Sequence, residues 1–162
     1  MNNGFGNNFD EYAKNLLLKA IQNEISVIGI TDYFSIEGYK QLKALLSDSD
    51  RLQALIGVEF VDKAKSIIFL PNIELRLSVL VKRRNGTDSR INYHVMFSNE
   101  IEPSIIEEHF FRELKFTAEC NPGSKDERWS LTLENLRELG KTLILQHQEF
   151  KGYSDLVVGM MN

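Results

Sequence analysis

Apolar positions in the first quarter of the chain change from helical to strand spacing. Over Phe9–Asn23 the apolar residues recur every three to four positions, Asn8 precedes them as a capping residue, and acidic residues occupy the first turn. This pattern predicts a helix over Phe9–Asn23. The next run, Ile25–Ile30, is short, β-branched and almost continuously apolar, which is typical of a strand buried on both faces. Ser35 then stands in a capping position before a second amphipathic segment, which predicts a second helix.

The middle of the chain predicts strands joined by a tight turn. Ile67–Leu70 predicts a strand, and Pro71 after it predicts a bend, a bulge or a sheet edge, because proline cannot donate a ladder hydrogen bond. Asn85-Gly86 is a strong hairpin signal because both residues tolerate the backbone conformation of a two-residue turn. Strict alternation over Ile91–Phe97 predicts the second arm of that hairpin.

The last third predicts two helices and a final strand. Ser104–Leu114 and Leu131–Leu145 have helical spacing, and the apolar end at Ser154–Asn162 is interpreted as a strand. Helix, strand, polar loop and helix in succession are typical of an α/β protein. We therefore predict an α/β fold with mostly parallel strands, plus the hairpin around Asn85-Gly86, in a single domain over residues 1–162.

Composition narrows the class of protein. The chain has 162 residues and a formal net charge of −4, which argues against a general binder of phosphate backbones. No apolar run approaches the roughly 18 residues of a membrane span, and the first residues lack the pattern of a secretory signal, so a cytoplasmic location without membrane contact is expected. The single cysteine, Cys120, excludes an internal disulfide framework.

Three polar residues accompany the predicted strands and are candidates for chemistry. Asp32 follows the first strand, Glu74 lies on the polar side of the second, and His94 lies on the non-apolar side of the third. Carboxylate and imidazole donors together suit Zn²⁺, Mn²⁺ or Fe²⁺. The structural alternatives are that Asp32 caps the next helix, Glu74 pairs with an arginine, and His94 is a core histidine.

Three segments then occur in a recognisable order, and the end of the chain adds a fourth: Ile30–Tyr39, Leu70–Leu77, Ile91–Ser98 and Glu149–Asn162. Together they resemble the N-terminal PHP (polymerase and histidinol phosphatase) domain of TrlF-type AAA/SMC-like ATPases. The resemblance implies a distorted (β/α)7 barrel that holds divalent metals and hydrolyses phosphoesters. It also implies that Glu74 bridges metals, that His94 is a ligand, and that Asp32 is the aspartate of a Thr-Asp-His segment whose histidine is Tyr33 here.

The sequence departs from the family pattern in its ligands. It contains no His-x-His, and the phenol of Tyr33 is a poorer ligand than imidazole because its oxygen is protonated at neutral pH. The chain is therefore interpreted as an incomplete family member with weak or absent activity. An incomplete barrel would expose strand edges, so self-association is expected.

Basic residues offer two further hypotheses. Arg76 is expected either to bind a substrate phosphate or to neutralise Glu74. Arg83 and Arg84, with Lys82 and Arg90, form a basic cluster that is either a solvated hairpin tip or a contact for substrate or nucleic-acid phosphate.

The function that follows is a metal-dependent phosphoesterase module, acting with an ATPase in nucleic-acid processing or repair. In it, metal-bound hydroxide would attack a phosphorus centre, with Glu74 and His94 as ligands and Asp32 ligating or orienting water. The alternative is a non-catalytic interaction or regulatory domain that docks on an ATPase partner. Contact with nucleic acid through the hairpin arginines is a third reading.

Overall fold

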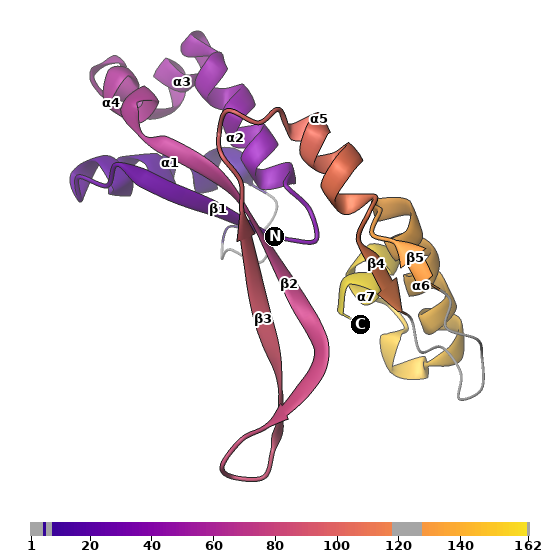
Figure 1. The fold of residues 1–162 in the computed structure, drawn as a ribbon. Coiled ribbons are helices and arrows are strands. Elements are labelled where there is room, and N and C mark those ends of the chain that lie inside the picture. The colour runs from indigo at the N-terminus through magenta and orange to yellow at the C-terminus, as the bar shows by residue number, and fades with distance from the viewer. Residues whose placement is uncertain (1–4, 6–7, 118–127, 162) are drawn as a thin grey trace. The chain divides into compact units, whose positions relative to one another are not determined.

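The computed structural model describes residue 5 and residues 8–117 and 128–161 (Figure 1). They divide into two compact units, which belong to Met1–Glu100 and Ile101–Asn162 and are described separately below. Both units combine helices with strands, so the predicted mixture of α and β structure is confirmed. The sequence predicts a single domain and gives no linker signal at this boundary. Cys120 lies outside the described residues.

The first unit contains four α-helices, one 3-10 turn and three strands within its described residues. In chain order they are α1 (Phe9–Gln22), β1 (Val27–Tyr33), α2 (Glu37–Ser47), α3 (Ser49–Ile56), η1 (Val58–Phe60), α4 (Val61–Ser66), β2 (Ile68–Lys82) and β3 (Asp88–Met96). The strands form one sheet in the order β1-β2-β3, with β2 parallel to β1 and antiparallel to β3. The described sheet is open and small.

Helix α1 begins where its sequence predicts. The side chain of Asn8 accepts a hydrogen bond from the backbone N–H of Glu11, and this bond satisfies a donor that the first turn leaves without an intrahelical partner. Ala13, Leu17 and Ala20 are buried one turn apart and pack in the core. Core residues from α1, α2, α3 and α4 pack with Ile30 of β1 and Phe69 of β2, so these helices cover one face of the sheet.

Strand β1 differs from the prediction in position and in burial. It runs from Val27 to Tyr33, so Asp32 lies within the strand instead of after it. Ile30 and Asp32 are buried, whereas Val27, Thr31 and Tyr33 on the alternate positions are exposed. The strand is thus buried on one face only, because the helices pack against one side of the sheet.

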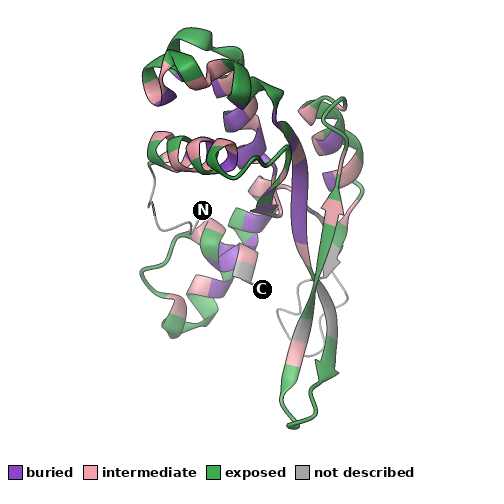
Figure 2. Ribbon diagram, turned by 90° about the vertical axis from the view of Figure 1, so that its left-hand side faces the viewer, coloured by how far each residue is buried: buried purple, intermediate pink, exposed green. Residues whose placement is uncertain are grey.

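Strand β2 is continuous through Pro71, which corrects the predicted bend. Pro71 lies in the central strand, in register with Ile30 of β1, and its carbonyl accepts the N–H of Phe97. The antiparallel pairing begins one residue later, at Asn72 and Met96, so the missing N–H costs a bond only at the end of the ladder. Buried residues concentrate in this first half of β2 (Figure 2), whereas Arg76 and residues 80–82 are exposed.

The hairpin predicted at Asn85-Gly86 is confirmed. The N–H of Arg83 donates to the carbonyl of Thr87 at 2.8 Å, and Gly86 adopts φ +82°, a region that suits glycine. Pairing of β2 with β3 is antiparallel, and so is the pairing in the second unit. The expected predominance of parallel strands is therefore wrong for the described residues, in which only the β1–β2 pairing is parallel.

The second unit contains short strands between helical segments. In chain order its described elements are α5 (Pro103–Ile105), the π-helical segment η2 (Ile106–Phe111), β4 (Lys115–Thr117), β5 (Arg128–Ser130), α6 (Leu133–Gln146), the 3-10 turn η3 (Gln148–Phe150) and α7 (Asp155–Met161). Strands β4 and β5 form an antiparallel pair. The helix predicted over Ser104–Leu114 is thus one short α turn followed by π-helical backbone, whereas the helix predicted over Leu131–Leu145 is confirmed as α6.

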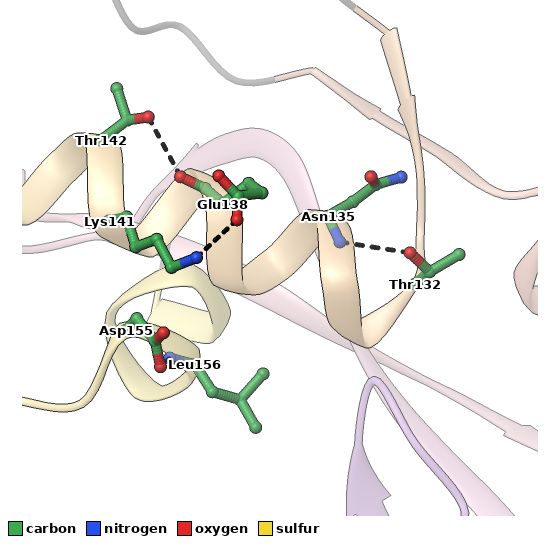
Figure 3. A network of polar contacts seen from close by, with 7 residues as sticks. All are labelled: Thr132, Asn135, Glu138, Lys141, Thr142, Asp155 and Leu156. Carbon is green, nitrogen blue, oxygen red and sulfur yellow. Dashed lines mark hydrogen bonds and ion pairs between the residues drawn. The ribbon is translucent and has the colours of Figure 1, made fainter.

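The end of the chain is helix α7, so the strand predicted there is wrong. Its residues pack on α6, where Leu139, Leu143 and Val158 form a small buried cluster. Polar contacts fix the ends and the exposed side of this pair (Figure 3). Thr132 caps α6 by accepting from the N–H of Asn135, Lys141 pairs with Glu138 at 2.6 Å, and Asp155 accepts from the N–H of Leu156 at α7.

Among the described residues, we find no helix that combines the length and the apolar character needed to span a membrane.

Candidate functional site

A row of aligned residues crosses the three-stranded sheet. Tyr33 of β1 is in register with Glu74 of β2, and Glu74 is in register with His94 of β3. Register partners on neighbouring strands project to the same side of a sheet. The three side chains therefore share one face, which we call the polar face and define by Thr31, Tyr33, Asn72, Glu74, Asn92 and His94.

Asparagine side chains hold the centre of the polar face. The Nδ2 of Asn92 donates to Glu74 Oε1. The Nδ2 of Asn72 donates to Thr31 Oγ1 at 2.6 Å and lies 3.2 Å from His94 Nδ1. Glu74 is 7% exposed and Asn72 is 8% exposed, whereas their partners Thr31, Asn92 and His94 are exposed, so these contacts are only partly shielded from water. Each group of the Glu74–His94 pair is thus oriented by its own amide.

Asp32 lies on the opposite face of the sheet. It is in register with Ile73, one position away from the Tyr33–Glu74 pair, and neighbouring residues of a strand project to opposite sides. Its Oδ2 accepts the N–H of Gly38 at 2.7 Å, in the first turn of α2. The structure therefore brings Glu74 and His94 together and separates Asp32 from them, so the expected three-ligand arrangement is not formed.

The surroundings of Asp32 explain its position. A carboxylate at the start of α2 satisfies N–H groups that have no intrahelical partner and complements the positive end of the helix dipole. Burial raises the pKa of Asp32 above its ordinary value, and the backbone N–H groups of Gly38 and Tyr39 offset part of that rise. Burial and then the negative charge of Asp32 raise the pKa of Tyr12 in α1. Asp32 thus has the helix-capping role that the sequence left open as its structural alternative.

The arginines expected at the site do not converge on Glu74. The guanidinium of Arg76 lies 5.6 Å from the centre of the Tyr33 ring, a cation–π contact at the end of the row. Arg83 and Arg84 lie at the far end of β2, about 30 Å from Glu74 at the usual rise of a strand. Arg83 donates to Ser89 Oγ at 2.9 Å. Arg83 and Arg84 therefore do not share a small phosphate with Glu74 and His94, and their contact with a substrate or nucleic-acid phosphate stays a prediction.

The described residues do not complete a metal site. Within the described part of the chain, three or more His, Cys, Asp or Glu residues nowhere gather in a geometry that holds a metal ion. Glu74 and His94 supply one oxygen and one nitrogen donor, and the third position of the row is a phenol. Zinc sites in proteins ordinarily use three or four protein ligands. We therefore derive no hydrolytic step from this face.

Three further residues with a carboxylate or imidazole group, Glu59, His109 and His147, do not belong to the polar face. Glu59 is exposed in η1, and His109 is exposed in η2. His147 is the C-terminal cap of α6, with its Nδ1 3.6 Å from Glu149 Oε1. The residues that sequence reasoning missed are Asn72 and Asn92. Each lies two residues from Glu74 or His94, so the period of a strand would have placed them on the same face.

Comparison with known proteins adds no relative: no family model, no curated protein and no solved structure matches this chain.

Proposed function

We propose that this chain is a module of a PHP-type metal-dependent phosphoesterase, with a partly formed barrel, in which Glu74 and His94 contribute two metal ligands. The observation that carries the proposal is the aligned row of Tyr33, Glu74 and His94 on one face of the sheet. The same three positions carry the resemblance to PHP domains, in which the position of Tyr33 is a histidine. Glu74 and His94 differ in donor type, as ligands for Zn²⁺, Mn²⁺ or Fe²⁺ do.

The proposal limits the expected activity. Two protein ligands hold a divalent ion less firmly than the three or four of an ordinary site, since each further ligand must then come from water or from another polypeptide. We expect weak metal binding and weak or absent phosphoester hydrolysis by the chain alone. A role in nucleic-acid processing with an ATPase partner belongs to the same proposal and is supported by the resemblance only.

Isothermal titration of the purified chain with Zn²⁺ or Mn²⁺ tests the two ligands. We expect one binding event that Glu74→Gln and His94→Gln each abolish. Glu59→Gln and His109→Gln are matched controls, because they remove an exposed carboxylate and an exposed imidazole elsewhere in the chain. Absence of binding, or binding that all four variants retain, would contradict the metal site.

The second candidate function is a non-catalytic domain that docks on a protein partner such as an ATPase. The observation that favours it is the apolar surface around the row: Val27, Ile68 and Met96 are exposed and, by their register, project from the same side of the sheet as Glu74. In the described sheet, β1 and β3 are both edge strands. Open edges and exposed apolar side chains also favour association between copies of the chain.

Metal content separates the two candidates. A folded protein that binds no metal, and whose unfolding midpoint is unchanged by Glu74→Gln and His94→Gln, would support docking over hydrolysis. Replacing Met96 by lysine should then weaken association of the chain in sedimentation velocity, because a charge would enter the apolar surface.

A further inference from the structure

Strands β2 and β3 continue beyond the end of β1 as a two-stranded arm. β1 ends at Tyr33, opposite Glu74, whereas the pairing of β2 with β3 extends further, to Lys82 and Asp88, with a register shift between Arg76 and Leu80 (Figure 1). We define the arm as residues 75–93. At the usual rise of an extended strand it is about 25 Å long. Neither of its edges pairs with another described strand of the first unit.

The arm is exposed on its strands as well as at its turn. Leu80 is 53% exposed and Tyr93 is 55% exposed, and Val81 and Ile91 are exposed as well. No described element of the first unit packs over these positions (Figure 2). A narrow ribbon with both faces open can enter a groove, which a sheet covered by helices cannot.

The charge of the arm is opposite to that of the chain. Residues 75–93 contain five basic residues and one acidic residue, although the whole chain has a net charge of −4. Lys82, Arg83 and Arg84 are exposed at the turn, and none of the three forms an ion pair with a described residue. The hydrogen bond from Arg83 to Ser89 Oγ holds one guanidinium at the turn. The three cations are therefore available to an anionic partner.

We infer that the arm binds double-stranded DNA, with the ribbon in the major groove and Lys82, Arg83 and Arg84 on backbone phosphates. The major groove of B-form DNA is about 12 Å wide and admits a two-stranded β-ribbon. The major groove of duplex RNA is too narrow for side chains to enter, which favours DNA over RNA. Three adjacent cations are also unlike the core of a protein–protein interface, in which charged residues are depleted, so an acidic protein is the weaker partner for this turn. The rest of the chain is acidic and repels DNA phosphates, so the contact is expected at the arm alone.

Fluorescence anisotropy with a short labelled DNA duplex tests the inference. At low salt we expect binding whose affinity falls with salt concentration, with a logarithmic slope of up to about −3 for three phosphate contacts. Replacing Lys82, Arg83 and Arg84 together by glutamine should weaken binding by about tenfold or more and flatten the slope. The matched control replaces the exposed Lys14, Lys19 and Lys63 by glutamine, which removes the same charge from α1 and α4 and should leave the affinity within about twofold.

Each other outcome contradicts the inference. If the control variant with substitutions in α1 and α4 lost as much affinity for DNA, the binding would be general charge attraction and not a contact of the arm. Equal affinity for duplex RNA would exclude the groove geometry, and displacement of DNA by an acidic polypeptide at equal charge concentration would indicate a protein partner. No binding of the unmodified chain at low salt would exclude the contact altogether. Circular dichroism of both triple variants checks that they are folded. The test does not involve metal, so it is independent of the proposed hydrolytic function.

Discussion

The side-chain amide of Asn72 lies between Thr31 and His94 on the polar face. Its Nδ2 is 2.6 Å from Thr31 Oγ1 and 3.2 Å from His94 Nδ1, and its Oδ1 is buried without a hydrogen-bond partner among the described residues. An N–H that donates to His94 Nδ1 occupies that lone pair, so the neutral ring carries its proton on Nε2. Neither nitrogen of His94 is then free to ligate a metal. Metal binding through Nε2 requires an acceptor at Nδ1, such as the amide oxygen of Asn72 after the amide has turned over.

Replacing Asn72 by aspartate supplies that acceptor permanently. A carboxylate that accepts from His94 Nδ1–H frees Nε2, and such partners change metal affinity by about 10- to 100-fold. For Asn72→Asp we expect Zn²⁺ to bind about tenfold more tightly than in the unmodified chain. The ¹⁵N chemical shifts of His94 in the metal-free protein should show the proton moved to Nδ1. Asn72→Leu provides no acceptor and should bind Zn²⁺ no more tightly than the unmodified chain. Unchanged shifts and affinity in Asn72→Asp would contradict this role of the amide.

The buried carboxyl of Asp32 makes stability depend on pH. Its pKa is raised in the folded chain, chiefly by burial, so above the ordinary value of 3.8 the folded state binds more protons than the unfolded state. The contribution of Asp32 to stability is therefore fully present below that value and is lost as pH rises through the folded-state pKa. Urea unfolding at several pH values should show the unmodified chain losing stability, relative to Asp32→Asn, as pH increases through this window. A difference that does not vary with pH would contradict the burial argument.

At the scale of elements, the register of β1 decides which residue joins Glu74 and His94. A shift of one residue exchanges the two faces of a strand, so Tyr33 occupies the row and Asp32 faces the helices. Local sequence does not determine this choice. The apolar run Ile25–Ile30 has no alternation that marks a face, and the exposed side follows only from where the helices pack. The N–H of Gly38 then gives Asp32 a partner on the buried side.

Replacing Tyr33 by histidine tests the register directly. Because Tyr33 is aligned with Glu74, an imidazole there would add a third donor to the face that carries Glu74 and His94. We expect Tyr33→His to tighten Zn²⁺ binding by about tenfold or more and to give Co²⁺ the intense visible absorption of a tetrahedral site. Tyr33→Phe should give neither change. If Asp32→His tightened Zn²⁺ binding and Tyr33→His did not, the two residues would be assigned to the wrong faces of the sheet.

Elements with a local signal were predictable, and those that depend on packing were not. The cap of α1 by Asn8 and the turn at Asn85-Gly86 are formed by residues within a few positions of each other, so the sequence alone locates them. The final helix α7 has no comparable signal, since its short apolar run suits a strand equally well. Its conformation follows from packing against α6, which is separated from it in sequence. Alternation along each strand predicts the faces on which Glu74 and His94 lie. The contacts that orient their side chains, from Asn92 and Asn72, depend on how the strands are aligned, which the sequence does not give.

At the scale of the whole molecule, the chain divides into two compact units although its sequence predicts one domain. The second unit depends on a close approach of α6 and α7. A Cβ added at Gly140 would lie 1.7 Å from the carbonyl oxygen of Asp155, and one added at Gly159 would lie 1.9 Å from that of Leu136. Both contacts are with backbone, which cannot move aside as a flexible side chain does. Glycine at these two positions is therefore what allows the helices to pack. The sequence does not reveal this, because it does not show that α6 and α7 pack against each other.

Substitution of Gly140 by alanine should therefore destabilise the second unit and leave the stability of the first unit unchanged. We expect the added methyl group to separate α6 from α7 at a cost of about 1–3 kcal/mol, the usual range for overpacking. Hydrogen exchange should become faster in residues 133–161 and stay unchanged in residues 8–96, because the buried cluster that contains Val158 lies in the second unit and the cluster that contains Leu17 lies in the first. Leu145→Ala is the control in the same helix, since Leu145 is 88% exposed and should change neither unit. Faster exchange throughout the chain in Gly140→Ala would mean that the two units unfold together, and the division into separate units would then have no energetic counterpart.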